Sequence, residues 1–500
     1  MGIDKFYKDS FILTLSNMVT GMIAFIFSII LSRELGAEGL GLYGLIMPVY
    51  GLLLCFTSDG FITAISKIST VHFNRKDIRN LNKTLSTVFT FILLWASSVS
   101  VLVMLCSKSV AIHIVRDARA AEALMLISPA LVFVPVSAVI KGYFYGLGKY
   151  KVTATIDIAE KLLRVIILLS AIAILKPSNV GKTVAIAYFA LAAGELVSMT
   201  ILFICYRIQK SKITGNTVRS KSRIQLLFDV FVISVPLCLN GILSSVLSTI
   251  STLVLPWRLV AAGFTYSEAL ALIGRFSGMA LNIAFLPFII ISSMLTVLVP
   301  ELSLNMSRKD YWSAEKRIAQ VLKLACAVGI ATAIVCLTLP ETMGRLFYQR
   351  NDLGNMIRFA SVICLLSFIS SPTFGILNAL GKQNILLKNS LIISVEGLVL
   401  VFLLAAVPSF NIFGYGLSIA LTSISALIIN LREIKKICEV KIELQDVVTL
   451  VLAGTVAFLA SRLTAGLLSG AIPLIQAVAV VSMSFGIILG FGGITFRTQN

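Results

Sequence analysis

Charged residues are scarce in this sequence. Only 13% of the 500 residues are Asp, Glu, Lys or Arg, whereas 58% are hydrophobic, and the mean hydropathy is +0.97. A chain with so little polar surface cannot coat a soluble globule. The composition therefore excludes a soluble protein and predicts an integral membrane protein.

The residue patterns that mark most enzymes are also missing. The chain has only two histidines, and its eight cysteines form no C-x-x-C pair. It contains no H-E-x-x-H, no G-x-x-x-x-G-K-[ST] and no nucleophile elbow. We therefore expect no metal site, no cofactor and no direct use of ATP, and we predict that the chain is not an enzyme.

Acidic residues are few relative to basic ones, 23 against 42, which gives a formal charge of +19. In a soluble protein this excess would suggest nucleic acid. Here the basic residues lie mostly in short loops between apolar runs, where they set topology and contact anionic membrane lipids. We therefore predict membrane lipids, and no nucleic acid, as partners.

Long apolar runs fill the rest of the chain. A span needs about 20 apolar residues in a helix, and β-barrel spans are excluded because these runs are far longer than about 10 residues. We predict an all-α polytopic protein with about fourteen transmembrane helices, near residues 11–32, 41–66, 84–106, 122–147, 155–175, 183–206, 226–255, 270–299, 317–339, 355–380, 385–407, 412–431, 446–466 and 472–492.

The basic loops then orient the chain. The richest ones, near residues 67–83, 207–223 and 432–441, all connect an even-numbered span to an odd-numbered one and so lie on one side. By the positive-inside rule that side is the cytoplasm. We predict that both termini are cytoplasmic.

Two loops recur at a spacing of 233 residues. The frame G-x-x-x-x-x-G-K occurs at 142–149 and 375–382, and Arg-Lys-Asp occurs at 75–77 and 308–310. We expect the glycines of 142–149 to allow a tight turn. The offset predicts two parallel six-helix lobes, residues 1–206 and 226–431, joined by a basic cytoplasmic linker at 207–225 and followed by two extra helices in 432–500. This is the architecture of a transporter.

Ionisable residues inside the spans are candidates for the functional site. A charge at the bilayer centre costs on the order of 2.5–3.5 kcal/mol, so it normally faces a partner or a wet cavity. The substrate-binding candidates are Arg164, Glu160, Arg275, Arg33, Lys67 and Lys141, and the coupling-ion candidates are Glu195, Glu396 and Asp59. One interpretation is a wet, partly cationic path for an anionic headgroup. The other is structural: Glu160 and Arg164, four apart on one helix face, form a closed ion pair, and the remaining cations extend to the interface.

Several stretches resemble a known family. Residues 32–43 (SRELGAEGLGLY) look like the connection between spans 1 and 2 in the polysaccharide-export branch of the multidrug/oligosaccharidyl-lipid/polysaccharide (MOP) flippase superfamily. Residues 141–146 (KGYFYG), followed by Glu160 and Arg164, are similar to a pattern of the stage V sporulation protein B group. Residues 256–263 and 286–301 resemble it too.

This resemblance implies a MATE-like fold in the bacterial cytoplasmic membrane. It also implies a flippase for an undecaprenyl-diphosphate-linked saccharide, such as a lipid II-type peptidoglycan precursor for the spore wall, with cell-wall synthesis enzymes as further partners. Related lipid II flippases hold their substrate with arginines in the cavity, notably in span 1. Here Ser28 is uncharged, which moves the expectation to Arg164 and Arg275.

Two other functions stay open at this stage. A cation- or proton-coupled drug antiporter of the same superfamily would use Glu195, Glu396 and Asp59, although Arg164 beside Glu160 disfavours a cationic substrate. A non-transporting scaffold for cell-wall assembly would have a cavity too closed or too apolar for a headgroup.

Overall fold

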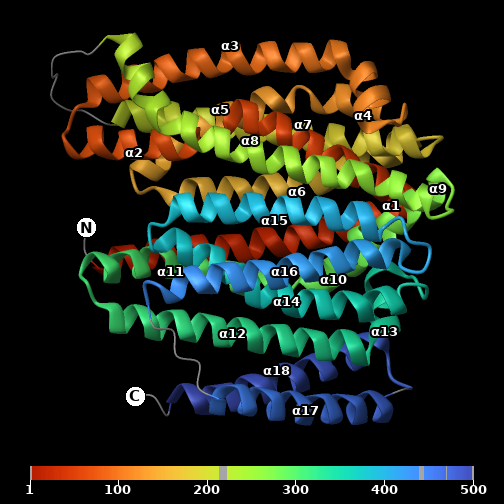
Figure 1. The fold of residues 1–500 in the computed structure, drawn as a ribbon. Helices are drawn as coiled ribbons and strands as arrows, with labels where there is room; N and C mark the ends of the chain where they lie inside the picture. The colour runs from red at the N-terminus through yellow and green to blue at the C-terminus, as the bar shows by residue number, and fades with distance from the viewer. Residues whose placement is uncertain (1–2, 213–221, 439–443, 469, 498–500) are drawn as a thin grey trace. The chain divides into compact units, whose positions relative to one another are not determined.

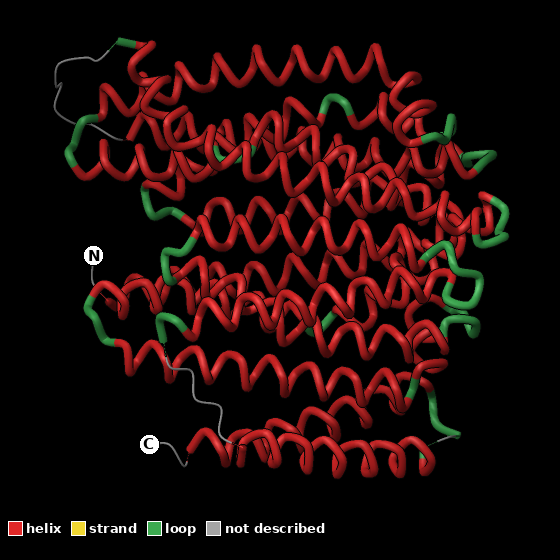
Figure 2. The backbone as a smooth tube through the Cα atoms, viewed as in Figure 1, coloured by secondary structure: helices red, strands yellow, loops and turns green. Residues whose placement is uncertain are grey.

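The computed structural model describes residues 3–212, 222–438, 444–468 and 470–497. Those residues are helical apart from short turns, and they contain no β-strand (Figure 1; Figure 2). A helix pairs its backbone N–H and C=O groups within one segment, as a bilayer requires. The predicted all-α fold is confirmed.

The chain divides into two compact units. Unit 1 comprises Met1–Phe27 and Glu34–Leu253, and unit 2 comprises Ser28–Arg33 and Val254–Asn500. Helices α1 and α8 each contribute residues to both units. The first eight α-helices and one π-helical turn are α1 (Ile3–Ser58), α2 (Phe61–Asn74), α3 (Ile78–Val110), η1 (Ala111–Val115), α4 (Ala120–Ile127), α5 (Ala130–Gly146), α6 (Tyr150–Leu175), α7 (Val180–Lys212) and α8 (Arg223–Ala261).

The remaining helices all belong to unit 2. They are α9 (Tyr266–Ile273), η2 (Gly274–Ala280), α10 (Leu281–Phe285), α11 (Phe288–Ser307), α12 (Tyr311–Thr338), α13 (Pro340–Tyr348), α14 (Gly354–Ala379), α15 (Gln383–Leu404), α16 (Asn411–Lys435), α17 (Leu444–Leu467) and α18 (Pro473–Arg497). The predicted linker at 207–225 overlaps the end of α7 and the start of α8, and its residues 213–221 lie outside the described part.

Twelve helices in the described residues are long and apolar enough to cross a membrane. One of them, Thr14–Asn74, holds two of the predicted spans, which meet at a kink at Gly36 (φ 67°, ψ −176°). Helix α6 is not among the twelve, and it carries Asp157, Glu160, Lys161 and Arg164. Helices nevertheless occupy all fourteen predicted runs, so the predicted count stands as an approximation.

Three predicted spans are interrupted. The fourth breaks at Ser128–Pro129, between α4 and α5. The second breaks at Asp59–Gly60, where Gly60 has φ 80° and its Cβ position would lie 2.5 Å from the carbonyl oxygen of Ser234. The eighth passes through the π-helix η2 and breaks at Leu286–Pro287. Glycine tolerates positive φ, and proline lacks the N–H that continues a helix.

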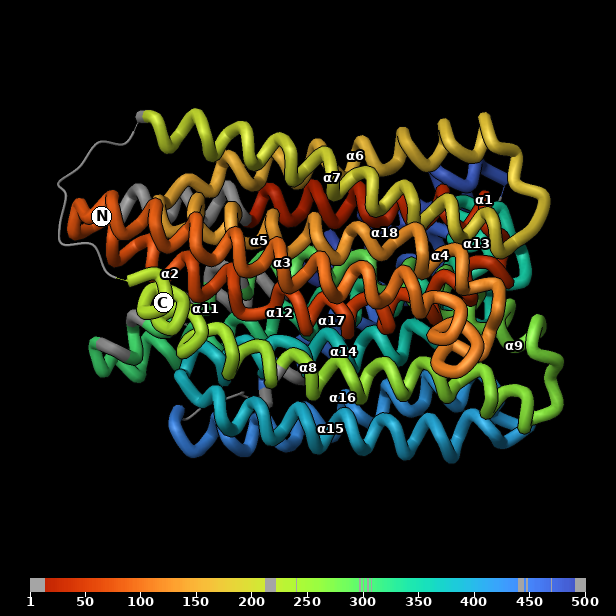
Figure 3. Tube along the Cα trace, turned by 90° about the horizontal axis from the view of Figure 1, so that it is seen from above, coloured from red at the N-terminus to blue at the C-terminus, as the bar shows by residue number. Residues whose placement is uncertain are grey.

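The 233-residue offset recurs in the backbone of each unit. Lys76 and Lys309 both have left-handed φ angles, 57° and 59°, as do Gly148 and Gly381 at 68° and 72°. The aspartates that follow the two lysines each cap a helix: Asp77 accepts from Asn80 N in unit 1, and Asp310 accepts from Ser313 N in unit 2. Thus α3 corresponds to α12 and, by the start of each helix, α6 corresponds to α15. Helix α6 packs beside α7, and α15 beside α16 (Figure 3).

The glycines at 142 and 146 correct one expectation. They lie inside α5 rather than in a turn, four residues apart. A Cβ atom would lie 2.8 Å from the carbonyl oxygen of Ile62 at Gly142, and 2.7 Å from that of Ser66 at Gly146. Small residues at this spacing let two membrane helices approach closely. Only Gly148 makes the turn.

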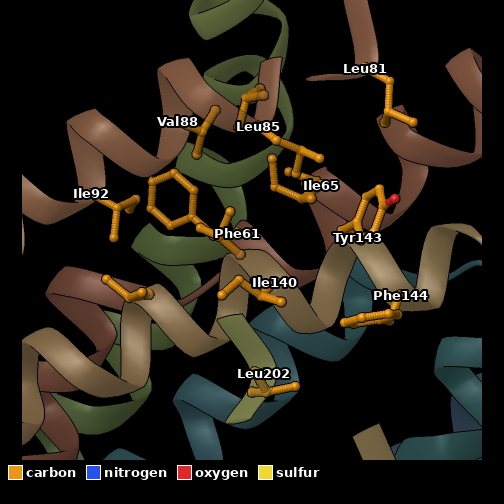
Figure 4. Packing of buried hydrophobic residues seen from close by; sticks show 14 of the residues in the cluster. Phe61, Ile65, Leu81, Leu85, Val88, Ile92, Ile140, Tyr143, Phe144 and Leu202 are labelled. Carbon is orange, nitrogen blue, oxygen red and sulfur yellow. The ribbon is translucent and has the colours of Figure 1, made fainter. Parts of the chain in front are cut away.

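The core of unit 1 fills the space around this contact. Side chains from α2, α3, α5, α7 and α8 converge in it (Figure 4). Buried members include Phe61, Leu85, Ile140, Tyr143 and Leu202. Because lipid tails are as apolar as these side chains, close packing rather than expulsion of water holds membrane helices together. This core positions α5 and α7, which carry part of the candidate site.

Candidate functional site

Helix α6 carries four ionisable residues within eight positions: Asp157, Glu160, Lys161 and Arg164. Helix α7 adds Glu195, and α5 adds Lys141. Residues three or four apart share one face of a helix, so α6 directs this set toward its neighbours. All six residues belong to unit 1.

Arg164 forms the centre of the cluster. Its Nε donates to Glu160 Oε1 at 2.8 Å, and its Nη2 lies 2.6 Å from the same oxygen and 3.0 Å from Glu195 Oε1. The side chains of Arg164 and Glu160 are only 10% and 4% exposed. The ion pair expected from their spacing is therefore present, and Glu195 joins it. One arginine between two buried carboxylates is strongly coupled, because removing it would leave both acids unpaired.

Two lysines complete the cluster. Lys161 Nζ lies 2.8 Å from Glu160 Oε2, and Lys141 Nζ lies 2.6 Å from Asp157 Oδ1. The cluster thus contains three cations and three carboxylates, and its formal charge sums to zero at pH 7. The predicted cationic character is therefore local: it resides in the two lysines, whose side chains are 20% exposed at Lys141 and 31% exposed at Lys161.

A polar cavity opens beside these groups. Its volume is about 220 Å³, and it is lined by Ser16, Asn17, Thr20, Lys141, Asp157, Glu160, Lys161, Glu195 and Ser198. The Ser198 hydroxyl is buried and has no hydrogen-bond partner in the described part of the chain. A cavity with polar groups on several sides suits water or a polar ligand rather than an acyl chain.

Gly194 allows α7 to approach this cluster. A Cβ atom on Gly194 would lie 2.9 Å from Glu160 Oε1. Nearer the start of α7, the Tyr188 hydroxyl donates to the carbonyl oxygen of Tyr43 at 2.7 Å. The rings of Tyr188 and Tyr43 stack with centroids 4.7 Å apart. These contacts fix α7 against α1 and α6 and so hold Glu195 at Arg164.

The predicted arginines of unit 2 form a separate group. Arg275 Nη1 lies 3.0 Å from Asp352 Oδ2, and Arg350 donates to both oxygens of Asp352 at 2.8 Å. Hydrogen bonds from Arg350, and to a smaller extent from Arg275, hold the pKa of Asp352 well below its usual range. Arg33 Nη2 donates to the carbonyl oxygen of Phe347 at 3.1 Å. Asp352 thus binds two arginines, a partner that the sequence reasoning missed.

The remaining predicted residues lie away from the charged cluster. Lys67 is exposed on α2. Asp59 lies in the turn between α1 and α2, close to Gly241 of α8. Glu396, on α15 in unit 2, accepts a hydrogen bond from Ser425 at 2.7 Å. Of the three coupling-ion candidates, only Glu195 belongs to the cluster.

Asp157 and Lys161 were also missed. The signal was available, because four ionisable residues within eight positions of an otherwise apolar run are unusual in a membrane span. The uncharged Ser28 has a simple role in unit 2, where its hydroxyl accepts from Asn282 Nδ2 at 2.8 Å. In the described residues, no group of three or more His, Cys, Asp or Glu side chains is arranged to hold a metal ion.

Residues 6–306 match the family described as "Polysaccharide biosynthesis protein". This match covers more than half of the 500 residues. The chain belongs to this family. Together with the apolar helices, this makes it a multi-pass membrane protein, and one of its relatives is named a lipid II flippase, a transporter rather than an enzyme.

Stage V sporulation protein B of Bacillus subtilis (strain 168) is 26% identical over 458 residues, which are 89% of this chain and 86% of that protein. The solved structure of "Lipid II flippase MurJ, inward closed conformation" superposes with a TM-score of 0.70 at 14% identity, covering 99% of both chains. An inward-facing MATE family transporter of the MOP superfamily gives 0.67 at 15% identity, covering 83% of this chain and 95% of its own. The predicted MATE-like fold is confirmed.

Proposed function

We propose that this chain is a flippase that moves a lipid-linked anionic saccharide from the inner to the outer leaflet of the bacterial cytoplasmic membrane. The cargo would be an undecaprenyl-diphosphate saccharide, a lipid II-type peptidoglycan precursor used in building the spore wall. The family description, the similarity to a sporulation protein and the fold shared with a lipid II flippase support this proposal.

The observation that carries the proposal is the polar cavity beside α6. A diphosphate cannot cross apolar tails without a large desolvation cost. Lys141 and Lys161 reach the cavity as compact positive charges, and Lys is a common phosphate binder. A diphosphate that replaces Asp157 and Glu160 at these ammonium groups would keep both cations paired. Arg164 would then hold Glu160 and Glu195 in place.

The rest of the predicted machinery fits the same proposal. The lobes at 1–206 and 226–431 would alternate in opening the pathway to each side, with both termini in the cytoplasm. Arg33 and Arg275 would contact the headgroup later on its path, and Lys67 would attract it at the cytoplasmic surface. The polyprenyl tail would stay in lipid throughout.

Transport in proteoliposomes tests the proposal. We would compare flipping of a fluorescent undecaprenyl-diphosphate sugar lipid by the wild type, by Lys141→Gln/Lys161→Gln and by Lys151→Gln. Lys151 is an exposed lysine of α6 outside the cavity and serves as the matched control. We expect the double variant to lose most of the flipping and the control to keep it. Normal flipping by the double variant would show that the headgroup binds elsewhere. Absence of flipping in the wild type and in both variants would favour the non-transporting scaffold.

A second function is favoured by one observation. Glu160 and Glu195 are two carboxylates at the cavity that share one arginine, and such a pair could exchange a proton for a cation. A drug antiporter of this kind would take up a fluorescent cation in response to a pH gradient, and Glu195→Gln would abolish that uptake. Gradient-driven uptake without lipid flipping would select this function.

A further inference from the structure

Unit 1 contains a second, larger cavity that the proposed transport site does not use. It has a volume of about 590 Å³ and lies among α3, α5 and α7. Its lining is apolar at one end and basic at the other. Leu85, Ile140 and Tyr143, which belong to the core of unit 1 (Figure 4), line the buried part of this cavity.

The opposite end of the cavity carries two exposed cations of α7, Arg207 and Lys210. The Arg207 guanidinium lies 5.3 Å from the ring centroid of Phe203, and Lys210 Nζ lies 5.8 Å from that of Tyr206. Neither cation forms an ion pair with a described residue, and none of the lining residues is acidic. The aromatic rings hold the two charges at the mouth without neutralising them.

The position of the mouth along the helices indicates the depth of the cavity. Arg207 and Lys210 belong to the last two turns of α7, which ends at Lys212. Lys149, in the turn after α5, donates to Gln209 Oε1 at 2.5 Å, so the end of α5 meets the same level. By the basic loops these ends lie on the cytoplasmic side. Two cations at the interface and an apolar floor deeper in the helix layer match the two parts of a phospholipid.

We propose that this cavity binds an anionic phospholipid of the cytoplasmic leaflet. Its phosphate would lie on Arg207 and Lys210, and an acyl chain would run along Leu85 and Ile140. A zwitterionic lipid carries its own cation and gains less from the two basic residues. Each basic residue near an anionic surface strengthens binding roughly fivefold. The proposal concerns a resident lipid and does not depend on the identity of the cargo.

Native mass spectrometry of the purified full chain tests this site. Phosphatidylglycerol, phosphatidylcholine with the same acyl chains and soluble glycerol phosphate would be titrated separately. We expect phosphatidylglycerol to bind more tightly than phosphatidylcholine, and glycerol phosphate not to compete. Arg207→Gln/Lys210→Gln should weaken phosphatidylglycerol binding roughly tenfold or more.

The chain offers a closely matched control. Arg432 and Lys435 are exposed at the end of α16 with the same residue types and the same spacing of three, and Arg432→Gln/Lys435→Gln should leave this binding unchanged. Ser86→Trp, which fills the cavity from α3 without removing charge, should weaken binding of both lipids.

Unchanged phosphatidylglycerol binding in Arg207→Gln/Lys210→Gln would overturn the proposal. So would an equal loss in the control, or full competition by glycerol phosphate. If the double variant aggregates, Lys210→Gln alone would be measured. Its loss of phosphatidylglycerol affinity should be about half that of the double variant on a logarithmic scale.

Discussion

The corresponding helices of the two units, α6 and α15, begin with the same backbone geometry but differ in the side chains that follow. Each follows a glycine with left-handed φ, Gly148 or Gly381, and each has a lysine at the N-cap. At the 233-residue offset, however, the charged residues of α6 have uncharged counterparts. Ser390, Ile393, Ser394 and Gly397 of α15 stand where α6 has Asp157, Glu160, Lys161 and Arg164.

Unit 2 also buries polar groups near this helix, but they are neutral. Asn389 of α15 donates to Asn430 Oδ1 at 2.9 Å, and Asn430 donates to Thr373 Oγ1 at 2.9 Å. Helix α15 packs on α16 with one acid between them, Glu396 bound to Ser425, and without an ion pair. An ion-pair cluster like that of α6 is therefore not needed for the fold. This difference is the strongest argument that the cluster of unit 1 serves function.

The largest expected effect comes from removing the central cation of the cluster. Arg164→Gln should destabilise the protein by about 3–5 kcal/mol, because Glu160 and Glu195 would remain as buried unpaired carboxylates. Denaturant unfolding in detergent would measure the loss. The triple variant Glu160→Gln/Arg164→Gln/Glu195→Gln, which makes this site neutral like that of unit 2, should recover most of it. A triple variant as unstable as the single one would contradict the comparison.

A smaller effect is expected at a pair of glycines, one in each unit. At Gly194 a Cβ atom would lie 2.9 Å from Glu160 Oε1, whereas at Gly397 the nearest atom is a Thr422 methyl at 3.3 Å. Gly194→Ala should therefore cost about 1–3 kcal/mol through displacement of Glu160. Gly397→Ala should lie within about 1 kcal/mol of the wild type, since alanine also favours helix. Thermal unfolding of both variants checks this, and equal losses would show that the charged contact adds no constraint.

The smallest effect concerns the equivalent helix caps, Asp77 and Asp310. Burial favours a raised pKa at Asp77, but hydrogen bonds from Asn80 outweigh it and lower the pKa. The stability from ionised Asp77 is thus complete at neutral pH and is lost as the pH falls through about 4 and below. Asp77→Asn should flatten the dependence of stability on pH between 5 and 3. Exposed Asp310, whose pKa is lowered by hydrogen bonds from Ser313, should show a weaker change in Asp310→Asn. The measurement is the unfolding midpoint as a function of pH, for the wild type and both variants in parallel. If the midpoint changed equally with pH in the wild type and in Asp77→Asn, Asp77 would not be the source of the pH dependence.

Much of the fold follows from the sequence because it rests on local rules. Apolar runs of span length must be helical in a bilayer, and the 233-residue offset located turns whose φ angles proved alike. The pair Glu160–Arg164 followed from a spacing of four on one helix. These inferences need no knowledge of how one helix faces another.

The rest depends on helix rotation, which the sequence does not encode locally. Glu195 reaches Arg164 only because Gly194 lets α7 approach, and Lys141 finds Asp157 only through the packing of α5. The break at Gly60 was missed because apolar residues continue on both sides of it. The glycines at 142 and 146 were assigned to a turn because their partner, α2, lies about 80 residues earlier in the chain.

The zero formal charge of the cluster has an electrical consequence. An elementary charge that crosses the membrane field gains or loses about 2.3 kcal/mol per 100 mV. Three cations and three carboxylates that move together do almost no such work, so this cluster should add no voltage dependence of its own. At this site, only a bound anionic cargo, which a negative interior drives outward, would then respond to the potential.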